Sequence, residues 1–164
     1  MPGNNLFAVK ITQPLLFLLT AVVAFAAGAA VEHTIQPAPL ESCIIRRADV
    51  KQSGGDWGSI RVYTRDTTAT TGTDSMLTAE LEFLPGKRLP PPHLHPNEEF
   101  QYVISGRGTW HLNGKDIPLE AGDLMYAKPG DLHGIANTGT EPLRFLVIKW
   151  NSKGVARPVE PARK

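Results

Sequence analysis

The sequence has very little cysteine and very little net charge, and each shortage excludes a class of protein. Cys43 is the single cysteine among 164 residues, so no disulfide can form within the chain. Lys and Arg number 17 against 16 Asp and Glu, and the sequence contains no basic stripe or nucleic-acid motif. The composition therefore excludes an internally disulfide-bonded scaffold and predicts no nucleic acid or other polyanion as a partner.

Long apolar runs are few beyond the N-terminus, where residues 15–31 form an uncharged stretch preceded by Lys10. Bulky residues come early in this stretch and small residues come late, which is the order found in secretory signals. We interpret residues 1–29 as a signal peptide, cleaved after Ala26 or Ala29, that directs export to the periplasm or the medium. The alternatives are an uncleaved membrane anchor, because the length is the lower limit for a span, and a buried helix.

Breakers and composition divide the rest of the chain into three parts. Residues 30–58 contain prolines and the run "SGGDWG", and we interpret them as a linker and an N-terminal arm. Residues 59–150 are predicted to form the folded domain, and residues 151–164 a flexible tail. Within the arm, Cys43 is flanked by Ile44 and Ile45, which predicts a small buried side chain in a strand.

The domain segment carries the signals of an antiparallel β protein. The sequence has 15 Gly and 14 Pro, and short apolar runs alternate with turn clusters. Asn113-Gly114 is typical of a two-residue hairpin turn. Alternation predicts that Trp110 points into the core and His111 points outward. The predicted strands are residues 59–64, 75–84, 99–105, 108–113, 115–120, 123–128, 132–138 and 143–150 of a sandwich or barrel.

Four residues carry the candidate chemistry. His93, His95 and Glu99 are separated by two and four positions, so in an extended segment they share one face. Two imidazoles and a carboxylate are suitable ligands for a divalent transition metal. His133 follows a tight Pro-Gly turn at the start of a later strand and supplies a fourth donor. The sequence therefore predicts a metal site formed by two separate segments.

These segments closely resemble the two motifs of the cupin superfamily. The glycines, histidines and glutamate of the first motif are all present, with one extra residue before the first histidine. The second motif is also present, but its proline is displaced by one position. The matching residues are Gly86, His93, His95, Glu99, Gly106, Gly122, Gly130, His133 and Asn137, with Pro129 as the displaced proline. The resemblance implies an all-β double-stranded β-helix, or jelly-roll barrel, that follows the N-terminal signal or anchor helix. It also implies a homodimer in which Ser42 to Arg46 forms a strand against the partner's sheet.

The resemblance places a divalent metal inside the barrel mouth, held by the three histidines and Glu99. An exported chain would collect its metal outside the cell, where copper and zinc compete strongly with iron and manganese because affinity rises toward copper. Iron, manganese, copper, nickel and zinc therefore all stay open. Four protein ligands on a six-coordinate ion leave two positions for other ligands. We therefore predict a metal-dependent enzyme, an oxidoreductase with dioxygenase-like chemistry, that acts on a small oxygen-rich molecule, with Glu99 also able to act as a base.

Two other classes of function stay open, since one fold carries many activities. The first is a non-catalytic module that binds a ligand or a metal, because no second acid or base has a compelling inward position. The second is an isomerase, epimerase or decarboxylase. Gln101 shares the parity of the ligands and is a candidate for lining the pocket. Phe83, Trp110 and Met125 are further candidates, with packing in the core as the alternative.

Overall fold

The computed structural model describes residues 38–156. The predicted signal or anchor, residues 1–29, lies outside this range, as does most of the predicted tail. In the part of the chain that is described, no helix has the length and apolar character needed to cross a membrane.

The described residues form strands almost throughout, with one short 3-10 helix near the start. The elements in chain order are η1 (Arg47–Asp49), β1 (Gln52–Gly55), β2 (Gly58–Thr64), β3 (Thr73–Phe83), β4 (Glu98–Ser105), β5 (Arg107–Leu112), β6 (Lys115–Glu120), β7 (Leu124–Ala127), β8 (His133–Ala136) and β9 (Leu143–Ser152).

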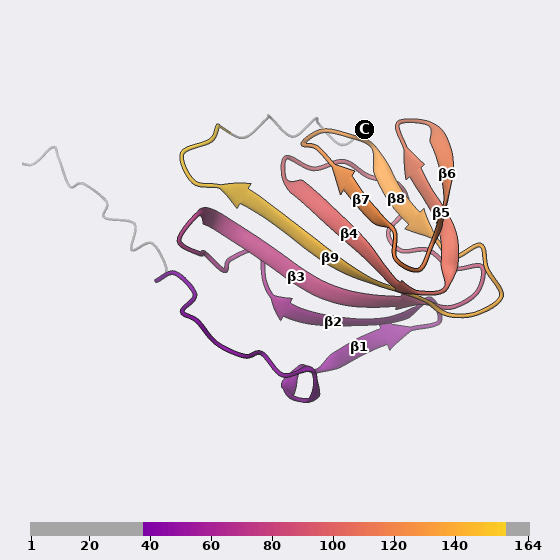
Figure 1. The fold of residues 1–164 in the computed structure, drawn as a ribbon, viewed down its shortest axis with the longest axis horizontal. Helices are drawn as coiled ribbons and strands as arrows, with labels where there is room; N and C mark the ends of the chain where they lie inside the picture. The colour runs from indigo at the N-terminus through magenta and orange to yellow at the C-terminus, as the bar shows by residue number, and fades with distance from the viewer. Residues whose placement is uncertain (1–37, 157–164) are drawn as a thin grey trace, which may run out of the picture. The chain divides into compact units, whose positions relative to one another are not determined.

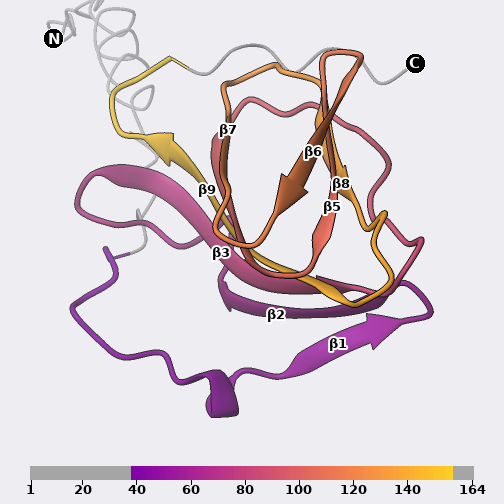
Figure 2. The ribbon, with the colours of Figure 1, turned by 45° about the vertical axis from the view of Figure 1, so that its right-hand side comes forward.

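The strands form two antiparallel sheets that face each other (Figures 1 and 2). The larger sheet has the order β1-β2-β3-β9-β4-β7, and the smaller has the order β6-β5-β8. Neighbouring strands are mostly distant in sequence, since β9 lies between β3 and β4, and β8 pairs with β5. This arrangement is the jelly roll expected from the sequence.

All eight predicted strands are present, with ends that differ by no more than a few residues. The hairpin between β5 and β6 turns at Asn113-Gly114, and both residues have positive φ, 48° and 82°. A turn of this kind matches the right-handed twist of the two strands. Trp110 is buried, and His111 lies on the outer face, where its Nδ1 is 2.8 Å from Asp116 Oδ1. The prediction for this hairpin is confirmed.

Two features of the N-terminal arm differ from expectation. The sheet begins at Gln52, because β1 pairs with β2 through a tight turn at residues 56–57, inside the segment expected to be an arm. The prediction that Cys43 is a buried strand residue is wrong, because Cys43 is exposed and Ile44 is 78% exposed. Residues 42–46 have no hydrogen-bonded neighbouring strand in the described chain, so their apolar side chains gain no burial from it.

The core lies between the two sheets and follows the alternation of the strands. On β3, Ala79 and Phe83 are almost fully buried against β4, β5 and β9 residues such as Val103 and Phe145. Phe83 and Phe145 pack edge to face, with ring centroids 5.0 Å apart. The even-numbered positions of β3 point to the opposite face of the sheet. The inner face is therefore apolar, which provides a dry wall for a site inside the barrel.

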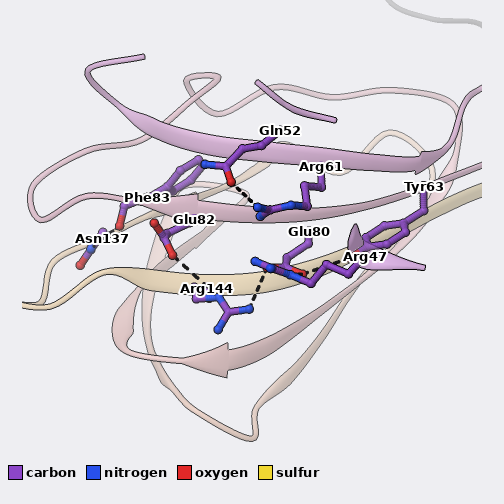
Figure 3. Close-up of polar contacts among 9 residues, drawn as sticks. All are labelled: Arg47, Gln52, Arg61, Tyr63, Glu80, Glu82, Phe83, Asn137 and Arg144. Atoms are coloured by element: carbon purple, nitrogen blue, oxygen red, sulfur yellow. Dashed lines mark hydrogen bonds and ion pairs between the residues drawn. The ribbon is translucent and has the colours of Figure 1, made fainter. Parts of the chain in front are cut away.

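A buried carboxylate occupies the outer face of the same strand (Figure 3). Glu80 is 8% exposed and accepts hydrogen bonds from Arg47, Arg144 and Tyr63. The bonds from Arg47 lower the pKa of Glu80 most, burial opposes them, and the bonds from Arg144 and Tyr63 lower it further, to about 2. This cluster ties η1, near the start of the domain, to β2, β3 and β9.

We predict that Glu80→Gln lowers the free energy of unfolding by about 1–2 kcal/mol at pH 7. The pKa of Glu80 falls from its ordinary 4.5 to about 2, a difference that corresponds to about 3 kcal/mol before allowing for the half-exposed Arg47. Because the folded-state pKa is the lower one, this stabilisation is present above pH 4.5 and disappears as the pH falls toward 2. Urea unfolding of the wild-type and Glu80→Gln proteins between pH 7 and pH 3 measures how the difference in their free energy of unfolding decreases.

Glu82→Gln is the matched control, since Glu82 is more exposed and lies 3.8 Å from Arg144 Nε. It should cost less than about 0.5 kcal/mol. Equal losses in the two variants, or a Glu80→Gln loss that does not change with pH, would contradict the role given to Glu80.

Candidate metal centre

The two segments of the candidate site are joined through their backbones. His93 lies in the loop between β3 and β4, and His133 begins β8. The two residues form an isolated antiparallel bridge, in which each N–H donates to the carbonyl of the other at 2.9 Å. Gly130 N–H also donates to the His95 carbonyl at 3.0 Å. Two segments distant in sequence therefore present their side chains at one place.

All four predicted donors converge there. The rings of His93, His95 and His133 have centroid separations of 5.5, 5.2 and 4.9 Å. One nitrogen from each ring belongs to a group whose atoms all lie within 4.8 Å of one another. Glu99 Oε2 lies 3.0 Å from His95 Nε2, and Glu99 Oε1 lies 3.5 Å from His133 Nε2.

The spacing of these atoms fits a metal ion. Nitrogen and oxygen ligands bind transition metals at about 2.0–2.2 Å, so ligand atoms around one ion lie roughly 3–4 Å apart. The three ring nitrogens, within 4.8 Å of one another, need only small side-chain rotations to reach this range. The three imidazole rings and the Glu99 carboxylate are also the kinds of ligand that first-row divalent metal ions prefer.

The hydrogen bonding of the histidines leaves nitrogen atoms available. His133 Nδ1 donates to the Asp131 carbonyl at 2.9 Å, so the neutral form of this ring carries its proton on Nδ1 and a lone pair on Nε2. That Nε2 is buried and has no hydrogen-bond partner among the described residues, and the same is true of Nδ1 in His93 and in His95. Buried polar atoms are normally paired, so an unpaired nitrogen in each of the three clustered rings fits a site that binds a ligand.

Charge in the cluster is already suited to a cation. Burial raises the pKa of Glu99, but the contacts with His133 and His95 outweigh it and lower the pKa to about 2. Burial and the neighbouring His133 and His95 lower the pKa of His93. For His133 burial is outweighed by Glu99 and the Asp131 carbonyl, which raise the pKa. At neutral pH the cluster therefore holds an ionised carboxylate among three imidazoles.

An apolar cavity of about 150 Å³ borders this cluster. His93 and Glu99 form part of its wall, together with Gln101 on β4. The rest of the wall is apolar apart from Gly134 and comes from β2, β3, β8, β9 and the loop after β3: Ile60, Leu77, Ala79, Leu81, Phe83, Leu89, Pro90, Ile135, Phe145 and Val147. A small molecule in this cavity would contact hydrocarbon on most sides and the donor atoms on one side.

The structure divides the candidate pocket residues into two pairs. Gln101 and Phe83 line the cavity. Trp110 and Met125 are buried in the hydrophobic core cluster and do not belong to the cavity wall. Their separation follows from strand position, since parity alone says that a side chain points inward but not which part of the interior it reaches.

Motif residues outside the donor set have structural roles. Asn137 is 1% exposed, and its Nδ2 donates to the Phe83 and Glu141 carbonyls at 2.8 Å. Its Oδ1 accepts from the Gly139 N–H at 2.9 Å. The bond to Phe83 holds the chain just after β8 against the end of β3 (Figure 3), and the other two shape the loop that leads to β9. Gly106 has a φ of 88°, and a Cβ there would lie 2.6 Å from the Pro142 carbonyl oxygen.

Sequence reasoning missed most of the apolar wall. Every second position of β3 from Leu77 to Phe83 carries an apolar side chain that lines the cavity. This period-two pattern already indicated a common inward face. The contributions of Ile60 and Val147 had no comparable local signal, because they depend on how β2 and β9 are placed beside β3.

Comparison with known proteins supports the same interpretation. The family model described as "Cupin domain" matches residues 79–149, which include all four donors. The oxalate-binding protein of Thermotoga maritima is 44% identical over 57 residues, 34% of this chain and 47% of that protein. Gentisate 1,2-dioxygenase of a Streptomyces species is 28% identical over 75 residues, 45% of this chain and 21% of that protein. The chain therefore spans about half of the first relative and about a fifth of the second.

A solved structure has the same fold over a longer range. The crystal structure of a predicted oxalate decarboxylase from Thermotoga maritima is 25% identical, with a TM-score of 0.55. The match covers 66% of this chain and 99% of that one. With both motifs meeting inside a jelly roll and the family match across them, residues 79–149 of this chain form a cupin domain.

Proposed function

We propose that the protein is a metal-dependent enzyme in which His93, His95, Glu99 and His133 hold a divalent transition metal. The observation that carries this proposal is the convergence of three imidazole rings with the Glu99 carboxylate, each ring having a buried nitrogen without a hydrogen-bond partner among the described residues. Purely structural histidines would be expected to have their buried nitrogens paired. The apolar cavity next to the cluster gives a substrate direct access to the same place.

The reaction class that we favour is dioxygenase-like oxidation of a small oxygen-bearing molecule. When bound, the metal would supply Lewis-acid or redox chemistry. The chain's own residues would orient the substrate and exclude water through the apolar wall. Glu99 stays ionised at neutral pH and can accept a proton from a substrate hydroxyl only if it gives up its contacts with His95 and His133. Similarity to a gentisate 1,2-dioxygenase supports this class.

A non-catalytic binding module is the second candidate, and a specific observation favours it. Apart from the donor residues His93 and Glu99, the cavity wall contains one polar side chain, Gln101, which is neither an acid nor a base. A reaction that needs a separate proton donor would find none among the side chains that line the cavity. Similarity to an oxalate-binding protein points in the same direction.

The first prediction concerns metal binding. His133→Ala should lower the affinity for a divalent ion by more than about 100-fold, because loss of a supporting partner alone commonly costs 10–100-fold. The measurement is calorimetric titration with Zn²⁺ and with Mn²⁺, followed by elemental analysis after dialysis. His111→Ala is the control, because His111 lies on the outer face beside Asp116 and should leave the affinity unchanged. Equal metal affinities in the two variants would show that His133 is not a ligand and would contradict the proposed metal site.

The second prediction concerns catalysis. Protein loaded with Fe²⁺, Mn²⁺, Cu²⁺ or Ni²⁺ should consume oxygen in the presence of at least one member of a panel of phenolic and diketone compounds. Oxygen uptake should fall to background in Glu99→Gln, which has almost the same size but loses the charge. The measurement is oxygen-electrode uptake with mass spectrometry of the products. Full metal occupancy with no turnover across the panel would favour the binding module instead.

A further inference from the structure

The tip of the hairpin between β5 and β6 contacts the loop that leads to His133. β8 pairs with β5 as far as Leu112 and His133, so Asn113 and Leu132 are the next two residues in this register. The Asn113 N–H donates to the Leu132 carbonyl at 2.8 Å, as it would in a further hydrogen-bonded pair of the two strands. The hairpin tip therefore lies beside the residue that directly precedes a predicted metal ligand.

The side chain of Asn113 completes this pair and adds a second contact. In a regular antiparallel pair the Leu132 N–H would donate to the main-chain carbonyl of the opposite residue. Here it donates to Asn113 Oδ1 at 2.9 Å, and Asn113 Nδ2 donates to Asp131 Oδ1 at 2.9 Å. Because a backbone N–H can only donate, the bond from Leu132 fixes which end of the amide is the oxygen.

Asp131 connects this amide to the imidazole of His133. Its carboxylate accepts from Asn113, and its main-chain carbonyl accepts from His133 Nδ1 at 2.9 Å. The bond to the ring sets the orientation of His133 and leaves Nε2 for the donor cluster. The same loop is also bonded to the first motif, because the Gly130 N–H donates to the His95 carbonyl at 3.0 Å. Asn113 and His95 therefore hold the loop at two points.

The hairpin turn alone does not require asparagine. The φ angles are 48° at Asn113 and 82° at Gly114, and asparagine, aspartate and glycine all accept the first of these positions. Glycine has no side chain to reach the loop, and an ionised aspartate has no donor. Of the three, only asparagine offers an acceptor to Leu132 and a donor to Asp131 while it also fits the turn.

We infer that Asn113 is a positioning residue for the metal site. It holds Asp131 and Leu132 so that the Asp131 carbonyl keeps its bond with His133 Nδ1, and His133 Nε2 stays directed at the donor cluster. Asn113 is not part of the cavity wall, so it acts through the loop and not by contact with a ligand in the cavity. This inference rests on the proposed role of His133 as a metal ligand, and it gives Asn113 a role beyond the hairpin turn.

The first test is Asn113→Gly, which fits the turn, keeps the main-chain bond to Leu132 and removes both side-chain contacts. Direct partners of metal ligands commonly contribute about 10–100-fold to affinity, and Asn113 is one residue further away, so the affinity for Zn²⁺ should fall about tenfold. Calorimetric titration measures this loss. In the metal-free protein at alkaline pH, where imidazoles are neutral, nitrogen NMR should show that His133 no longer keeps its proton on Nδ1 alone.

Asp123→Ala is the matched control. The Asp123 carboxylate accepts from the Glu120 N–H at 2.8 Å, so this variant also removes a side-chain bond that shapes a turn. Glu120 pairs with Arg107, at the end of β5 that is opposite to Asn113. The control should leave the Zn²⁺ affinity and the position of the His133 proton unchanged.

The double variant Asn113→Asp/Asp131→Asn tests for rescue at unchanged net charge. The carboxylate at position 113 can accept from the Leu132 N–H and from the amide at position 131, so both contacts are kept with the donor and acceptor of one exchanged. Its Zn²⁺ affinity should stay within about threefold of wild type, since additive losses are expected only when the partners do not interact. The His133 proton should stay on Nδ1.

Two results overturn the inference and leave the metal site intact. One is an unchanged Zn²⁺ affinity or an unchanged His133 proton position in folded Asn113→Gly, and the other is a double variant that loses as much affinity as Asn113→Gly. Wild-type protein that holds no Zn²⁺ overturns the proposed metal site instead. In that case the NMR of the metal-free protein still decides whether Asn113 orients the His133 ring.

Discussion

The site depends on one backbone interaction, the bridge between His93 and His133. The two residues come from different motifs, and their mutual hydrogen bonds of 2.9 Å fix the distance between the main chains that carry them. A donor set drawn from flexible segments would pay the entropy of ordering each segment when it binds an ion. Here the jelly roll has already ordered them, because β8 pairs with β5 and β4 pairs with β9. Folding and the assembly of the site are therefore the same event.

The alternation of β3 separates two kinds of chemistry on one strand. Its odd positions, such as Ala79 and Leu81, form a hydrocarbon wall beside the donors. Its even position Glu80 carries a carboxylate on the outer face, where Arg47 and Arg144 neutralise it. Glu80 and Glu99 both have a pKa of about 2, but for different reasons. Guanidinium groups hold Glu80 ionised as part of the fold, whereas imidazoles with unpaired nitrogens surround Glu99.

The sequence allowed the strands, the asparagine-glycine hairpin and the shared face of His93, His95 and Glu99 to be predicted, because these follow from local rules. Placing His133 beside them rested on its position after a tight turn and on the resemblance to the second cupin motif. Period-two alternation locates strands, and the residue types around residue 93 and residue 133 specify their own chemistry. The role of Cys43 was predicted wrongly, since a short apolar patch says nothing about whether a neighbouring strand exists to bury it. Gln101 and Trp110 both point inward, but only Gln101 reaches the cavity. That difference depends on the relative placement of two sheets, which no local pattern encodes.

Specificity within the fold rests on the wall more than on the donors. Many metal-binding jelly rolls could share three histidines and a glutamate, and such a set accepts most oxygen ligands. What this chain adds to the donors is a cavity wall with ten hydrocarbon side chains, together with Gln101 Oε1, which is buried and has no hydrogen-bond partner among the described residues. Because most of the wall residues lie outside the donor set, similarity in the donors alone does not transfer a ligand.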